Sequence, residues 1–108
     1  MSTFYIKQND TTPSIRATLE NGNGDAVDLT GATVRFHMRE IGQTTVTTDA
    51  SAVLVTANQG VVQYNWVADD TDAIGSFQGE FEVTYGDGTI ETFPNNGYIR
   101  VEITDDIT

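Results

Sequence analysis

Short segments in which apolar and polar side chains alternate constrain the fold of this chain more than any other feature of its sequence. In FQGEFEVTY (77–85), every second residue from Phe77 to Tyr85 is apolar or glycine, and the residues between them are polar. Successive side chains of a β-strand point to opposite faces. The segment therefore predicts a strand with one buried and one solvated face.

Seven further segments predict strands in the same way. They are FYIKQ (4–8), SIRATLE (14–20), TVRFHMRE (33–40), SAVLVT (51–56), VVQYNW (61–66), TIETF (89–93) and GYIRVEI (97–103). Turn-forming stretches rich in Asn, Asp and Gly separate them: NGNGD (21–25), NQG (58–60), GDG (86–88) and NNG (95–97). Pro94 lacks an amide donor, so the chain should leave the sheet there and re-enter it near Tyr98.

The only helical signal is ADDTDAIG (68–75), which predicts a single turn capped by an aspartate. We therefore expect one domain over residues 1–108, an immunoglobulin-like all-β sandwich of seven or eight mostly antiparallel strands. Its core should contain Phe36, Trp66, Phe81 and Val83. The chain has no cysteine, so packing and sheet hydrogen bonds must stabilise it without a disulfide.

The charge of the chain argues against nucleic-acid and membrane partners. Sixteen acidic residues against five basic ones give a formal net charge of −11, and such a surface repels phosphates and anionic lipids. The five cations are scattered along the sequence, apart from Arg35 and Arg39. No apolar run approaches the roughly 20 residues that span a bilayer, and the first residues lack the apolar stretch of a signal peptide.

No arrangement of residues predicts catalysis. The only histidine, His37, alternates with Phe36 and Met38 and should lie on the exposed face of its strand. There is no cysteine nucleophile, no serine in a Gly-x-Ser-x-Gly elbow and no glycine-rich phosphate loop. Paired carboxylates for glycoside hydrolysis stay open, although a small sandwich with one tryptophan offers little to hold a sugar. We expect no enzyme activity and no cofactor.

Two acidic segments offer oxygen ligands for a calcium ion. NGNGD (21–25) places Asn21, Asn23 and Asp25 at alternate positions, and DDTD (69–72) gathers three aspartates. The twelve-residue spacing and the terminal glutamate of an EF-hand loop are absent. Turn formation and helix capping are the simpler roles for both segments, so no metal site is predicted.

An ordered set of motifs resembles a known family. The set comprises the opening FYIKQND with Pro13, then DLTGATVRFHMRE (28–40), then residues 60–103 with Tyr64-x-Trp66, GEFEV (79–83), Asp87-Gly88 and TFPN (92–95) before a Tyr-Ile strand. Together these motifs resemble the immunoglobulin-like N-terminal domain of phage baseplate upper proteins. The resemblance implies a β-sandwich that docks into a virion through protein–protein contacts.

Such proteins usually continue into a stem and a part that carries receptor-binding proteins, whereas this sequence stops at Thr108. An excised domain and a free-standing module both fit that difference. The resemblance implies a virion protein, made in the host cytoplasm and placed in the tail, the baseplate, the neck or on the capsid. The sequence does not choose among these places.

The expected partners are other phage structural proteins, and homo-oligomerisation stays open. We expect the contacts to come from edge strands and hairpin loops. The loop residues are Asn21, Asn23, Asp25, Asp87, Asn95 and Asn96. The alternative function is a carbohydrate- or calcium-binding adhesion module on a particle or cell surface.

Overall fold

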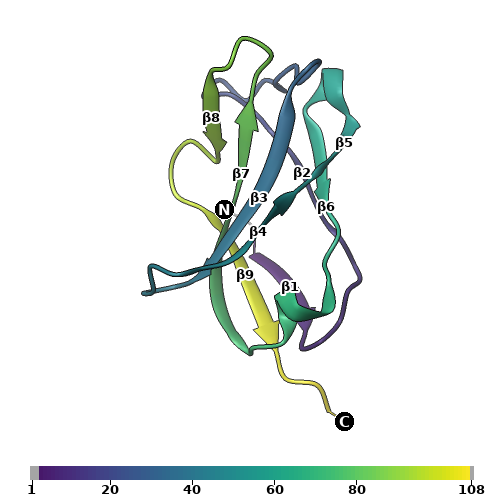
Figure 1. Cartoon of the computed structure of the whole chain (residues 1–108), viewed down its shortest axis with the longest axis vertical. Helices are drawn as coiled ribbons and strands as arrows, with labels where there is room; N and C mark the ends of the chain where they lie inside the picture. The colour runs from purple at the N-terminus through teal and green to yellow at the C-terminus, as the bar shows by residue number, and fades with distance from the viewer. Residues whose placement is uncertain (1–2, 108) are drawn as a thin grey trace.

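Residues 3–107, the part of the chain that the computed structural model describes, form nine β-strands and two short 3₁₀ helices (Figure 1). The strands are β1 (Thr3–Lys7), β2 (Ile15–Thr18), β3 (Thr33–Glu40), β4 (Val46–Ser51), β5 (Val53–Thr56), β6 (Val61–Tyr64), β7 (Gly75–Thr84), β8 (Ile90–Phe93) and β9 (Ile99–Thr104). The helices are η1 (Ala57–Gln59) and η2 (Ala68–Thr71). No helix within residues 3–107 is long and apolar enough to cross a membrane.

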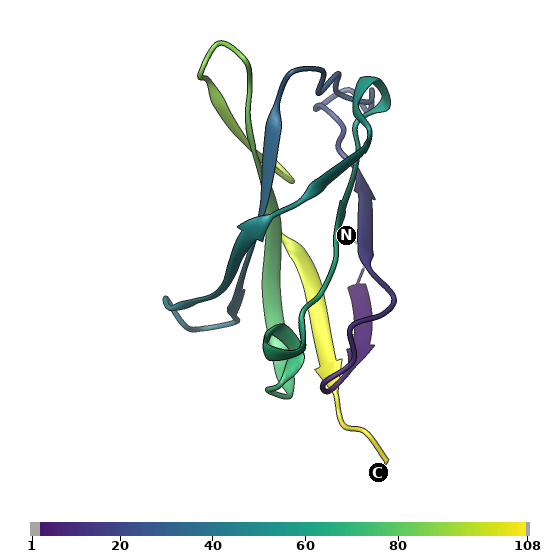
Figure 2. The same ribbon diagram turned by 45° about the vertical axis from the view of Figure 1, so that its right-hand side comes forward.

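The strands form two sheets. The larger sheet has six strands in the order β1-β9-β7-β3-β4, with β8 also paired to β7, and the smaller sheet has the order β2-β6-β5. All pairs are antiparallel except β1 with β9, which run in the same direction. In Figure 2, the indigo β2 lies across from the green β7 and the blue β3. The predicted all-β sandwich is confirmed.

The strand that the alternation pattern missed is β4, so the described chain has nine strands and not seven or eight. Its sequence VTTDAS is mostly polar because the strand lies at the edge of the six-stranded sheet. Thr48 is its only fully buried residue. Directly after β4, the chain passes Ala52 and enters β5 in the other sheet, so one run of extended chain joins the two layers.

The inward positions of the predicted strands form the core. Phe36, Trp66, Phe81 and Val83 are all buried, as predicted. The Phe36 ring of β3 packs on the Tyr64 ring of the opposite sheet, with ring centroids 4.9 Å apart. These aromatic contacts between layers join the sheets where each has its apolar face.

Gly79 occupies an inward position of β7. Because glycine has no side chain, this position leaves room for an aromatic ring. A Cβ at this position would lie 3.0 Å from the ring of Phe36. Glycine therefore lets Phe36 occupy the centre of the core while the alternation of β7 continues on either side.

β7 changes its pairing partner halfway along its length. Its first half, Gly75–Gly79, pairs with β9, and its second half, from Phe81 to Thr84, pairs with β8 on the same side. Between β8 and β9 the chain leaves the sheet at Pro94 and returns at Ile99, close to where the sequence predicted. Glu80 therefore lies at a gap in the ladder, beside the connection that contains Gly97 and Tyr98.

The predicted single turn is present as η2, but its N-cap residue is Val67 and not an aspartate; Asp70 lies at the third position of the turn. The carboxylate of Asp70 accepts hydrogen bonds from the Val67 amide at 2.9 Å, the Tyr64 hydroxyl at 2.6 Å and the Thr48 hydroxyl at 3.1 Å. The Asp70 side chain thus reaches back to the amide of the N-cap residue and ties the turn to a strand of each sheet.

Candidate functional site

The outer face of the six-stranded sheet, which points away from the three-stranded sheet, gathers most of the basic residues of the chain. The strand register places these side chains there. We use the name outer face for this side of the sheet. The side chains that lie on it include Tyr5, Lys7, Arg35, His37, Arg39, Val46, Asp49, Ser76, Gln78, Glu80, Glu82, Ile90, Arg100 and Glu102.

The charges of this face are balanced, unlike those of the rest of the molecule. The face holds four of the five Lys and Arg residues and four of the sixteen acidic residues. The rest of the molecule carries the other twelve acidic residues and only one Lys or Arg residue, Arg16. The basic residues looked scattered along the sequence because pairing between distant strands is what brings them together.

Ion pairs hold much of this charge in place. The Arg35 guanidinium donates to Asp49 at 2.8 Å, and the Nε2 atom of His37 lies 3.2 Å from the same carboxylate. The bond from Arg35 lowers the pKa of Asp49. At the other side of the sheet, Arg100 donates to Glu102 at 2.6 Å. Exposed pairs of this kind add little to stability, so their main effect is to neutralise the face.

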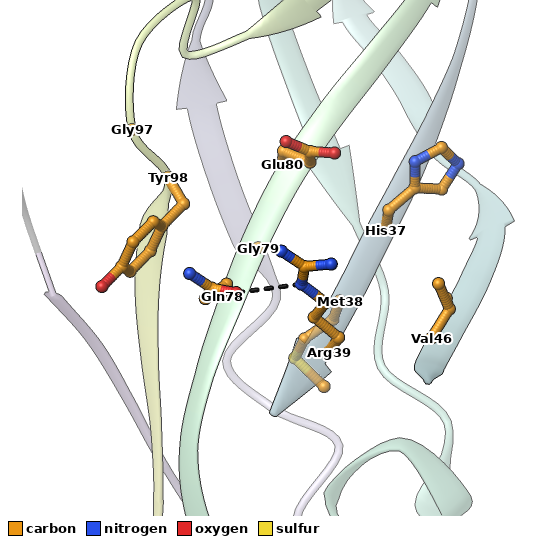
Figure 3. Close-up of a pocket in the computed structure, with 9 residues that line it drawn as sticks. All are labelled: His37, Met38, Arg39, Val46, Gln78, Gly79, Glu80, Gly97 and Tyr98. Atoms are coloured by element: carbon orange, nitrogen blue, oxygen red, sulfur yellow. Dashed lines mark hydrogen bonds between the residues drawn. The ribbon is translucent and has the colours of Figure 1, made fainter. Parts of the chain in front are cut away.

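A shallow hollow of about 230 Å³ lies on the outer face where β7 changes partner (Figure 3). It is lined by His37, Met38, Arg39, Val46, Gln78, Gly79, Glu80, Gly97 and Tyr98. Small-molecule sites usually enclose about 300–1,000 Å³. The hollow is smaller and open, so its shape suits a side chain of a docked protein better than an enclosed ligand.

Two charged groups in the hollow have no charged partner among the described residues. Arg39 donates its Nε hydrogen to the Gln78 side chain at 3.0 Å, and its two terminal nitrogens make no bond within residues 3–107. Glu80 makes neither a hydrogen bond nor an ion pair within the same range. Figure 3 shows both side chains at the hollow, on neighbouring strands.

The predicted loop residues do not form a single site. The turn with Asn21, Asn23 and Asp25 lies between β2 and β3, at the same end of the sandwich as the β7–β8 turn with Asp87 (Figure 1). Asn95 and Asn96 lie in the β8–β9 connection at the side of the sheet, and that connection also lines the hollow.

Polar side chains in these loops bind the backbone of their own turns. Asn21 accepts hydrogen bonds from the amides of Asn23 at 2.9 Å and Asp25 at 3.1 Å. Asp87 accepts from the amide of Thr89 at 3.0 Å and from its hydroxyl at 2.6 Å. These contacts are typical of Asx turns, so the loops are ordered surfaces. No three His, Asp or Glu side chains within residues 3–107 are grouped as a metal site.

Sequence reasoning missed the outer face because it considered edge strands and hairpin loops and not the solvated face of a whole sheet. The polar positions between Arg35 and Arg39, and those between Gln78 and Glu82, contained the signal. Turning that signal into a charge-balanced face requires the pairing of β3 with β7, in which His37 lies opposite Glu80.

The comparison with protein families gives one result. The model of a family described as the BppU N-terminal domain matches residues 3–106, nearly the whole chain. A search of curated proteins found no match.

Proposed function

The chain belongs to the family of BppU N-terminal domains, which are structural domains of phage baseplates, and from this premise we propose that it is a non-catalytic docking module of the virion. The family match over residues 3–106 carries the proposal. It implies a place among the structural proteins of a phage particle, with other baseplate or tail proteins as partners.

Edge strands, exposed turns and the outer face support docking by surfaces. A packed sandwich holds its turns and edge strands rigid, so a partner can bind them without a large loss of conformational entropy. Asp25 and Asp87 are exposed residues, and their turns lie at the same end of the sandwich (Figure 1). A partner at that end should therefore offer Lys or Arg.

The test is a pull-down with the immobilised chain from disrupted phage particles, beside a glycan array probed with the same protein. We expect a virion protein to be retained and no glycan to give saturable binding. Glycan binding without any retained virion protein would show that the adhesion alternative is correct and the docking proposal wrong.

Matched variants locate the contact. Asp25→Asn and Asp87→Asn each remove one charge; the Asp25 contacts in its turn are made by its backbone, and an asparagine at position 87 keeps the oxygen that accepts from Thr89. We expect each to reduce retention and to slow association, because charges at the edge of an interface act mainly on the association rate. Asp106→Asn removes the same charge beyond the end of β9. If it reduces retention as much as the loop variants do, the predicted loops are not the contact.

A further inference from the structure

The outer face combines balanced charge and exposed apolar side chains with a hollow in which Arg39 and Glu80, of opposite sign, have no charged partner among the described residues. We propose that two copies of this chain pack through their outer faces about a twofold axis, with Arg39 of each copy against Glu80 of the other. This inference concerns contacts between copies and does not depend on the docking role proposed above.

Charge limits where two copies can meet. Each copy carries a net charge of −11, and like charges brought together across an interface oppose association. Outside the outer face, twelve acidic residues are balanced only by Arg16. On the outer face, four cations match four carboxylates. The outer face is therefore the surface on which two identical copies repel each other least.

Exposed apolar side chains and the size of the face support the same contact. Tyr5 is 66% exposed, Val46 53% and Ile90 64%, and all three belong to the outer face. With a strand spacing of about 4.8 Å and a rise of about 3.4 Å per residue, the sheet presents roughly 600 Å². A standard interface buries about 800 Å² per partner, so a face-to-face pair would bury most of that area.

The charges of Arg39 and Glu80 make the contact self-complementary. In an isologous interface, a residue that contacts a second residue on the other copy is matched by the reverse contact. Arg39 lies opposite Gln78 in the sheet, and Glu80 lies two residues along β7 from Gln78, opposite His37. An axis through the hollow between these four residues would bring each Arg39 guanidinium to the Glu80 carboxylate of the other copy.

A charge swap tests the pairing. Dimerisation of the purified chain is measured by sedimentation over a range of concentrations, for wild type, Arg39→Glu, Glu80→Arg and the double variant. Each single reversal places like charges across the axis and should weaken dimerisation roughly tenfold or more. The double variant restores opposite charges and should recover most of the wild-type association.

Two control variants distinguish an effect of position on the outer face from an effect of net charge on dimerisation. Arg16→Glu on the smaller sheet and Glu20→Arg beside the β2–β3 turn change the net charge by the same amounts, and should leave dimerisation within about twofold of wild type. A monomeric wild type at every concentration would overturn the proposal. Single reversals that act no more strongly than their controls, or a double variant without recovery, would do the same.

A cross-linking measurement covers the case in which a charge reversal disturbs folding. The chain has no cysteine, so one introduced thiol reports a single position. Gln78 and Gln63 are matched, because each accepts an arginine Nε hydrogen at 3.0 Å on the solvated side of its sheet. With a short bismaleimide, Gln78→Cys should give a covalent dimer and Gln63→Cys should not. Equal cross-linking of both, or none at Gln78→Cys, would contradict the twofold pair.

Discussion

Phe81 shows how a single residue links the sequence pattern to the stability of the molecule. It occupies an inward position of β7, has no exposed surface, and lies with its ring centroid 5.1 Å from that of Phe36. Phe36 in turn contacts Tyr64, the last residue of β6 in the opposite sheet, and Trp66, which lies two residues further along the chain. The Phe81 ring therefore supports the aromatic cluster that joins the two layers.

Replacing Phe81 with alanine should lower the free energy of unfolding by about 3–5 kcal/mol, because it leaves a large cavity in a packed core. Urea unfolding of the variant and of wild type measures the loss. Ile74→Ala is the control, because Ile74 is an exposed residue outside the outer face. It should cost less than about 0.5 kcal/mol. A loss below about 1 kcal/mol for Phe81→Ala would contradict the core assignment.

At the scale of elements, the sequence predicted the strands whose faces differ in polarity and missed the one whose faces do not. β3 and β7 alternate over their whole length and were recognised. β4 has polar residues on both faces, because it lies at an edge and its buried Thr48 bonds to Asp70. Alternation cannot reveal a strand whose inward side chain is itself polar.

The candidate site was less accessible to sequence reasoning than the fold. The turns containing Asn21, Asp87 and Asn95 were located correctly by their residue types, but their positions relative to one another depend on which strands pair. The outer face depends on pairing even more strongly, since Arg39 and Gln78 are far apart in the sequence and meet only across β3 and β7.

The β7–β8 hairpin should make the stability of the chain sensitive to alkaline pH. Burial, and the hydrogen bond that the Tyr85 hydroxyl donates to Glu91 at 2.7 Å, raise the pKa of Tyr85 to about 12. An unfolded tyrosine has a pKa of about 10. The unfolded chain thus loses this proton first, so the contribution is complete below about pH 10 and disappears as the pH rises to about 12.

Unfolding measured from pH 8 to pH 12 should therefore show a loss of stability above about pH 10. Tyr64, whose pKa is also raised by burial and by its bond to Asp70, adds to the loss in the same direction. Tyr85→Phe should lose less stability than wild type over this range. An identical alkaline loss in the variant would show that the Tyr85 hydroxyl does not contribute.

At the scale of the whole molecule, stability rests on the contact between two sheets that no disulfide joins. The chain has no cysteine, and within residues 3–107 no carboxylates are grouped for a metal ion. Asn21 and Asp70, which belong to the two segments with calcium-like spacing, bind their own turns and neighbouring strands.

Folding should therefore be independent of metal ions. Calorimetry with EDTA and with added calcium should give the same melting temperature, because a structural metal would stabilise the native state through its binding free energy. A melting temperature that falls by several degrees with EDTA and recovers with calcium would assign a calcium site to residues 21–25 or 69–72.

The parallel pairing of β1 with β9 determines how this domain would respond to a mechanical load. The pairing runs from Thr3 beside Arg100 to Lys7 beside Thr104. Tension between the start of β1 and the end of β9 acts along both strands in opposite directions, so it shears the ladder. All of its hydrogen bonds then bear the force together and do not open one after another. A domain pulled in this direction behaves as a stiff link, whereas a pull that separates the sheets at their edges would meet far less resistance.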